Sequence, residues 1–124
     1  MIYLKNGHSI TIGNAGALAS RTHVSYADVS GATLDGSSAI VTSSATTYNV
    51  ATYAAAGTRN VRLVTVSNDG ASAGVFTISH NTGATTAPIG KALLQPGQVL
   101  VYSENGGVQV SSAESSTLAT LTLP

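Results

Sequence analysis

Short runs of β-branched and aromatic residues recur along this chain, and each run is closed by Gly, Asn or Asp. This pattern is typical of strands joined by tight turns, because branched side chains favour the pleated backbone and the closing residues tolerate turn conformations. No stretch has the apolar period of an amphipathic helix. Roughly eight or nine such runs predict an all-β fold, either a single antiparallel β-sandwich or a jelly-roll-like barrel with flexible terminal arms.

The turn signals also predict which runs lie antiparallel to each other. Asn-Gly and Asn-Asp-Gly sequences accept the positive φ of tight turns, so the runs on either side of them are expected to pair. The predicted pairs are 2–5 with 8–12, 60–67 with 74–80, and 98–103 with 108–110.

The chain has 124 residues, which is enough for one domain. The small residues from Gly13 to Ser20 look like a linker. We therefore expect an N-terminal hairpin or arm with its linker over 1–20, a β-sandwich domain over 21–112, and a C-terminal strand or tail over 113–124.

Charged residues make up only 8% of the sequence, against roughly 25% in an average soluble protein, and the formal net charge is zero. Such a composition suits a subunit whose surface is covered by neighbours. Serine- and threonine-rich exteriors are also common among extracellular β domains, so both explanations stay open.

The same composition argues against two classes of partner. Binding to nucleic acid needs clustered cations, whereas the five here are scattered at Lys5, Arg21, Arg59, Arg62 and Lys91. The apolar run 99–102 is far shorter than the ~20 residues that cross a bilayer, and residues 1–7 lack the features of a signal peptide. We expect neither nucleic acid nor membrane as a partner, and synthesis in the cytoplasm.

Candidate catalytic residues exist but form no recognisable motif. His23 or His80 with Asp28 or Asp69 and any serine would make up a triad, yet there is no Gly-x-Ser-x-Gly elbow. Nor does the Gly13–Gly16 stretch have the lysine of a phosphate loop. A pair of catalytic carboxylates would have to come from the five acidic residues, three of which fall in predicted turns. The five are Asp28, Asp35, Asp69, Glu104 and Glu114.

Metal binding is not predicted either. There is no cysteine, and the histidines at 8, 23 and 80 lack the close spacing that directs two imidazoles at one ion. A site assembled from distant strands remains open, with a divalent ion on an assembly axis as its expected form. We therefore predict no catalytic, cofactor-binding or metal-binding residue and no enzyme activity.

Glycan binding is a further alternative, because β-sandwiches often bind sugars through exposed aromatic rings. The chain has no tryptophan and five tyrosines, at 3, 26, 48, 53 and 102. Beside the break at Ala54–Gly57, Tyr53 is expected to be the most exposed of them.

Four segments carry a resemblance to a known class of proteins, and together they span about residues 45–112. They are Asn60–Asn68, Phe76–Asn81, Leu94–Tyr102 and Gly107–Val110. The most particular is Leu-Gln-Pro-Gly-Gln-Val-Leu-Val-Tyr at 94–102, which a glycine hairpin follows. These segments resemble small β-sandwich structural proteins of tailed-bacteriophage particles.

The resemblance implies a capsid decoration or cement protein on the exterior of the virion. It would bind the major capsid protein, act as a homo-oligomer (a dimer or a trimer), and pair strand edges through residues 1–12 or the tail 113–124. A tail, neck or baseplate adaptor and a glycan-binding module are the alternative functions.

Overall fold

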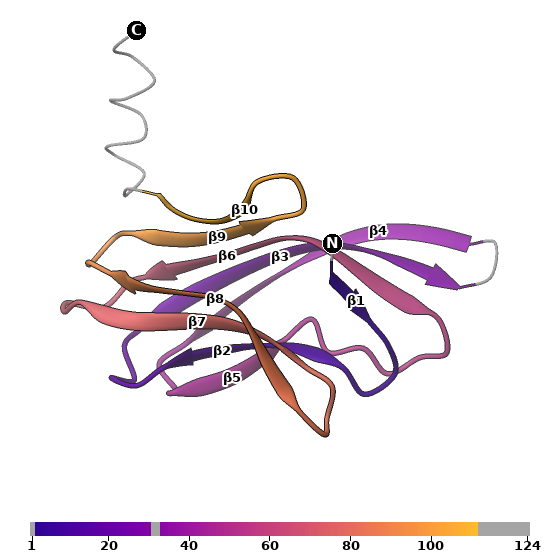
Figure 1. Cartoon of the computed structure of the whole chain (residues 1–124), viewed down its shortest axis with the longest axis horizontal. Helices are drawn as coiled ribbons and strands as arrows, with labels where there is room; N and C mark the ends of the chain where they lie inside the picture. Colours follow the sequence, from indigo (N-terminus) through magenta and orange to yellow (C-terminus); the bar gives the residue numbers. More distant parts are fainter. Residues whose placement is uncertain (1, 31–32, 112–124) are drawn as a thin grey trace, which may run out of the picture.

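The computed structural model describes residues 2–30 and 33–111, and these residues form ten β-strands and the turns between them (Figure 1). The strands are β1 (Ile2–Leu4), β2 (Ser9–Asn14), β3 (Ser20–Ser30), β4 (Thr33–Ser43), β5 (Thr47–Val50), β6 (Thr58–Asn68), β7 (Gly74–Asn81), β8 (Thr86–Leu94), β9 (Val99–Ser103) and β10 (Gly107–Ser111).

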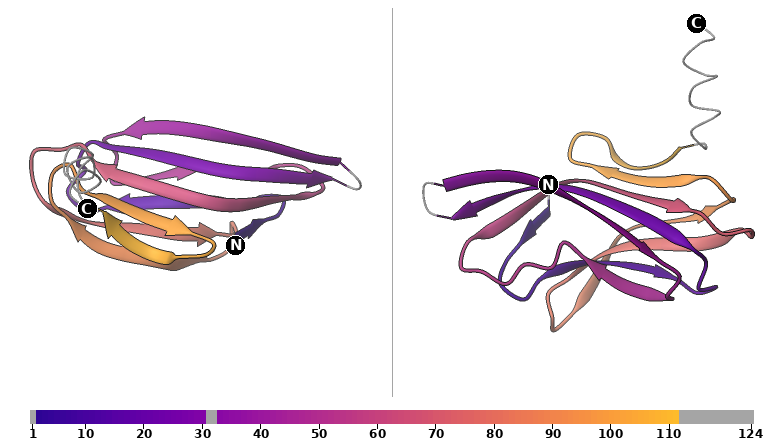
Figure 2. Two further views of the ribbon diagram at one scale, coloured as in Figure 1. Left: turned by 90° about the horizontal axis from the view of Figure 1, so that it is seen from above. Right: turned by 180° about the vertical axis from the view of Figure 1, so that it is seen from behind.

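Two antiparallel sheets pack face to face (Figure 2). The six-stranded sheet has the order β10-β9-β6-β3-β4, with β1 also paired to β6, and the four-stranded sheet has the order β5-β2-β7-β8. Within the described residues the strands do not close into a barrel. The all-β prediction is confirmed, in its sandwich form.

Alternating residues of both sheets fill the space between them. Val24, Val64 and Leu100 contribute from the larger sheet and Ile12 and Phe76 from the smaller one, and all five are fully buried. Each such side chain contributes about 1.5–3 kcal/mol by leaving water.

Two polar side chains that pack into this core, Tyr48 and Asn68, have hydrogen-bond partners. The Tyr48 hydroxyl lies 2.7 Å from the hydroxyls of Ser20 and of Thr22. Asn68, which is fully buried, donates from its side chain to the carbonyls of Ser72 and Leu94, both at 2.9 Å. These bonds offset the cost of burying amides and hydroxyls, and Asn68 fixes two loops at one end of the sandwich.

The first predicted hairpin is wrong. Gly7 does have the positive φ of a turn (86°), and the His8 amide donates to the Lys5 carbonyl at 2.9 Å. However, β1 pairs with β6 in one sheet, whereas β2 pairs with β5 and β7 in the other. The chain crosses between the sheets here because Leu4 and Ile10 then both face the core.

The second predicted pairing is also wrong. The turn after Asn68 leads from β6 in the larger sheet to β7 in the smaller one, so the two strands do not pair. In the same region, residues 86–94 form strand β8, which pairs with β7. The third pairing is confirmed, since β9 and β10 form an antiparallel hairpin over five residue pairs.

The segment 1–20 does not lie apart from the sandwich in the part that the structure describes. Leu4, Ile10 and Ile12 are fully buried in the common core, and β2 is a central strand of its sheet. The linker expected over Gly13–Ser20 is partly strand, since β2 extends to Asn14 and β3 begins at Ser20. The C-terminal segment predicted over 113–124 lies outside the described residues.

Candidate functional site

Apart from the three-residue strand β1, which pairs with β6 alone, the described residues form four edge strands, and their backbones are the first candidate for an interaction site. These strands are β4 and β10 in the larger sheet and β5 and β8 in the smaller one. An edge strand presents unpaired N–H and C=O groups that can pair with a strand of another chain. Proteins usually block such edges with proline, charged side chains, bulges or very short strands.

Three of the four edges carry such protection. Strand β8 contains Pro88 and Lys91, and its pairing with β7 is interrupted by a register shift that leaves Ile89 unpaired. Strands β5 and β10 have only four and five residues. None of these edges offers a long, regular row of free backbone groups.

Strand β4 is the fourth edge, and it lacks this protection. It pairs with β3 over eleven consecutive residues without a register shift. Its residues 36–43 include neither a proline nor a charge. Ile40 on this strand is 67% exposed. In Figure 2 strand β4 runs along one side of the molecule, and no strand of the described residues lies beyond it.

The acidic residues that were considered for a triad, Asp28 and Asp69, are engaged elsewhere. Asp28 accepts two hydrogen bonds from Arg59, at 2.7 and 2.9 Å. The Arg59 guanidinium also lies 3.9 Å from the centre of the Tyr26 ring. The hydrogen bond from Arg59 to Asp28 raises the pKa of Arg59. This arrangement ties β3 to β6 and leaves Asp28 occupied as an acceptor.

Asp69 is likewise bound within its own turn. It accepts a hydrogen bond from the Ser67 hydroxyl at 3.0 Å and lies 3.8 Å from Arg21. His23 is on the outer face of β3, where it pairs with Ile40 across the sheet. Glu104 is exposed in the turn before β10, while the side chains of Asp35 and Glu114 lie outside the described residues.

The prediction that Tyr53 is the most exposed tyrosine is wrong. Tyr53 is only 5% exposed and belongs to the core, whereas Tyr3 on β1 is 55% exposed. Backbone hydrogen bonds join Tyr53 to Gly7 (2.8 Å) and to His8 (2.9 Å), which draws the segment after β5 inward. Any sugar stacking on an exposed ring would have to involve Tyr3.

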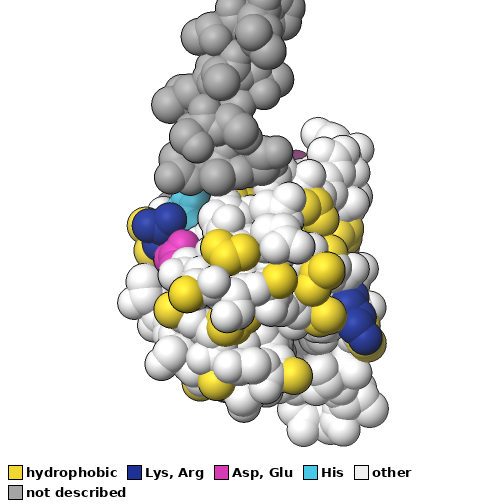
Figure 3. Space-filling view, turned by 90° about the vertical axis from the view of Figure 1, so that its left-hand side faces the viewer, with side chains coloured by type: hydrophobic (Ala, Val, Ile, Leu, Met, Phe, Trp, Pro, Cys, Tyr) yellow, Lys and Arg dark blue, Asp and Glu magenta, His cyan; other side chains and the backbone are white. Residues whose placement is uncertain are grey.

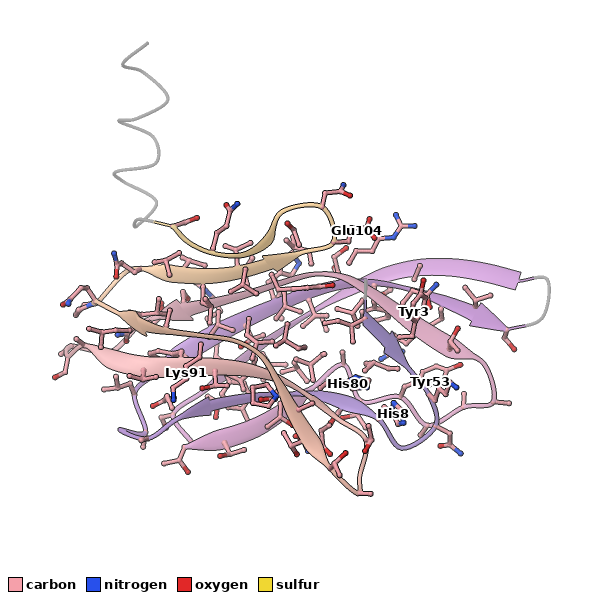
Figure 4. All side chains as sticks on the ribbon, viewed as in Figure 1. Tyr3, His8, Tyr53, His80, Lys91 and Glu104 are labelled. Atoms are coloured by element: carbon pink, nitrogen blue, oxygen red, sulfur yellow. The ribbon has the colours of Figure 1, made fainter. Side chains whose placement is uncertain are left out.

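A pair of histidines is the second candidate site, and no spacing or motif in the sequence indicates it. The Nδ1 atom of His8 lies 3.0 Å from the Nε2 atom of His80, with the ring planes at 60° to each other (Figure 4). Partial burial, and to a smaller extent the neighbouring His8, lower the pKa of His80. An open hollow next to His8 is lined by Lys5, Asn6 and Gly57, among others.

Within residues 2–30 and 33–111, no three His, Asp or Glu residues are grouped closely enough to hold a metal ion. The same residues contain no helix that is long and apolar enough to span a membrane.

Comparison of the chain with protein-family models gave no match, and comparisons with curated proteins and with solved structures gave none either.

Proposed function

We propose that this protein is a structural subunit that joins a larger assembly by pairing strand β4 with a strand of a neighbouring subunit. In its specific form, the proposal is a decoration or cement protein that binds the major capsid protein on the exterior of a bacteriophage particle. The observation that carries the proposal is the β4 edge, which is long and regular and has neither proline nor charge over residues 36–43. The phage assignment rests on the sequence resemblance alone.

The charge distribution supports an assembly role. Figure 3 shows one end of the sandwich, where Lys, Arg, Asp and Glu side chains lie at the margins and hydrophobic or uncharged side chains occupy most of the surface. Two of the ten charged residues of the chain, Arg59 and Asp28, neutralise each other. Few charges then have to be desolvated when such a surface is covered.

In this proposal, avidity makes the binding of the subunit to the assembly strong. One short strand pairing is weak, but many identical contacts on a symmetric shell add up without any single tight site. The strand pairing expected for residues 1–12 is assigned to β4 instead, because β2 is paired on both sides and β1 has only three residues.

A matched pair of variants tests the β4 edge. In Ile40→Lys a charge enters the edge of β4, whereas Leu93→Lys places the same charge at an exposed position (56%) on the protected strand β8. Placing a charge where a partner strand would cover it costs at least ~1.4 kcal/mol, or about tenfold in affinity. We expect Ile40→Lys to weaken binding to particles by that factor and Leu93→Lys to leave it unchanged. Equal binding of both variants would refute the role of β4.

The copy number of the chain in purified particles tests the phage assignment. A number comparable with that of the major shell protein supports a decoration or cement role. A handful of copies per particle points to the tail, neck or baseplate adaptor instead, which would use the same fold. Absence from particles contradicts both.

The glycan-binding alternative now depends on Tyr3. Binding to a glycan array that Tyr3→Ala abolishes and Tyr48→Phe preserves would favour a glycan-binding module. Tyr48 is a suitable control because its ring is packed against the core.

A further inference from the structure

The fold brings together two of the three histidines of the chain. His8 directly precedes β2, and His80 lies on β7, the strand next to β2. In the register of these strands Ile10 faces His80, so His8 and His80 are diagonal neighbours on the same face of the sheet. Side chains in this relation are within reach of each other.

The separation of the two nitrogens matches that of two ligands on one metal ion. Zinc binds histidine nitrogen at about 2.0–2.1 Å, so two imidazoles on one ion have nitrogens roughly 2.9–3.4 Å apart for coordination angles between a right angle and the tetrahedral value. The distance between His8 Nδ1 and His80 Nε2 is 3.0 Å. A small rotation of the rings would therefore direct both lone pairs at one ion.

The backbone holds both histidines in position. The His8 carbonyl accepts a hydrogen bond from the Tyr53 amide at 2.9 Å, and the Gly7 amide donates to the Tyr53 carbonyl at 2.8 Å. His80 is in a central strand, paired with Ile10 on one side and with Ala87 on the other. Little conformational entropy is left to lose when an ion binds, which favours affinity.

We propose that His8 and His80 form a binding site for a divalent transition-metal ion such as Zn²⁺, Ni²⁺ or Cu²⁺. These ions favour imidazole nitrogen, whereas Mg²⁺ and Ca²⁺ favour oxygen. His8 binds through Nδ1 and His80 through Nε2, so each ring carries its proton on the other nitrogen. Water occupies the remaining coordination positions, because His8 lines an open hollow that solvent can enter.

Two features of the surroundings act on this site. The hydrogen bond between the two rings has to be given up when the ion binds, because one of the facing nitrogens carries a proton in the metal-free pair. Lys5 lines the same hollow as His8, and its positive charge opposes a cation. Both effects lower the affinity, and the second predicts that Lys5→Gln binds the ion more tightly than the wild type.

Titration calorimetry with zinc chloride tests the proposal on the full chain after treatment with a chelator. The experiment is done at a pH above the ordinary pKa of histidine, because both ligands must be neutral. We expect saturable binding that His8→Gln and His80→Gln each weaken at least ~10-fold, since even changes outside the coordination sphere typically cost 10–100-fold. His23→Gln is the matched control and should bind as the wild type does.

NMR signals of the histidine rings in the wild type give a second test, which does not depend on how the variants fold. Zinc should shift the ring signals of His8 and His80 and leave those of His23 unchanged. The proposal is overturned by the absence of binding at millimolar zinc, by undiminished binding in either His8→Gln or His80→Gln, or by a shift confined to His23.

Discussion

Strands β4 and β8 are both long edge strands with an exposed aliphatic side chain, yet they differ in what they offer a partner. Ile40 on β4 is 67% exposed and Leu93 on β8 is 56% exposed. Strand β8 combines a proline, a lysine and a register shift, whereas β4 is regular along its whole length. The accessible backbone, more than the exposed side chain, therefore distinguishes an edge that can pair from one that cannot.

The two edges also differ in what lies beside them within the molecule. A Cβ atom added at Gly90 of β8 would be only 2.5 Å from Cγ1 of Val108, so β10 packs closely against β8. Strand β4 also contacts a strand of the other sheet, β5, but a Cβ atom added at Gly36 of β4 would have no neighbour within 4 Å. The space beside Gly36 is therefore more open than the space beside Gly90.

The largest expected effect tests whether the N-terminal strand is part of the folded core. If it is, residues 1–12 cannot act as a free arm, and β4 is left as the pairing edge. Leu4 is fully buried, so Leu4→Ala should lower the free energy of unfolding by about 2–5 kcal/mol. Denaturant titration measures this change, with Tyr3→Ala at the exposed neighbouring position as the control. A decrease of less than about 1 kcal/mol in the free energy of unfolding would show that residues 1–12 can act as a free arm. The case for β4 as the pairing edge would then be weaker.

An intermediate effect is expected when the protection of β8 is removed. The double variant Pro88→Thr, Lys91→Val makes this edge resemble β4, so it should gain concentration-dependent self-association, measured by analytical ultracentrifugation. The gain should stay small, because Val108 and the register shift still obstruct β8. If the variant remains as monodisperse as the wild type, proline and lysine are not what protects β8.

The smallest expected effect is the pH dependence of stability that His80 causes. It should not change association through β4. The folded state lowers the pKa of His80 below its ordinary value of about 6.5, mainly through burial. Between the lowered and the ordinary pKa the unfolded chain binds more protons. The contribution of neutral His80 to the free energy of unfolding is therefore fully present above about pH 6.5. It is lost as the pH falls through the lowered pKa.

Unfolding midpoints measured in the presence of a chelator over this pH range would show the effect. His80→Gln should flatten the dependence, whereas His23→Gln should preserve it. Association through β4 should not change over the same range as a result of His80, since His80 lies on the other sheet. If association through β4 and stability were lost together as the pH falls, the β4 edge and the surroundings of His80 would be coupled.

Local sequence signals predicted the elements well and their partners poorly. The glycine-containing turn before β10 predicted a hairpin correctly, because β9 and β10 are adjacent both in sequence and in the sheet. Asn6-Gly7 and Asn68–Gly70 predicted turns correctly but pairings wrongly. In both cases the chain passes from one sheet to the other, and a turn signal does not reveal this.

The candidate sites were even harder to predict from the sequence than the strand pairings. The residues His8 and His80 are 72 positions apart and meet only because β2 and β7 are neighbours. Tyr53 was expected at the surface from the alanines and glycine that follow it, yet its backbone hydrogen bonds to Gly7 and His8 place it in the core. Non-local pairing decided each of these outcomes.

The sequence by itself determined that this chain is built of strands, where most of its turns fall, and that its surface carries few charges. These properties follow from backbone preferences and composition, which act within a few residues. Only the tertiary structure decided which strands share a sheet, which strand is left as an unprotected edge, and which histidines meet. Those outcomes depend on burying residues that are distant in sequence against one another, so they arise only when both sheets form together.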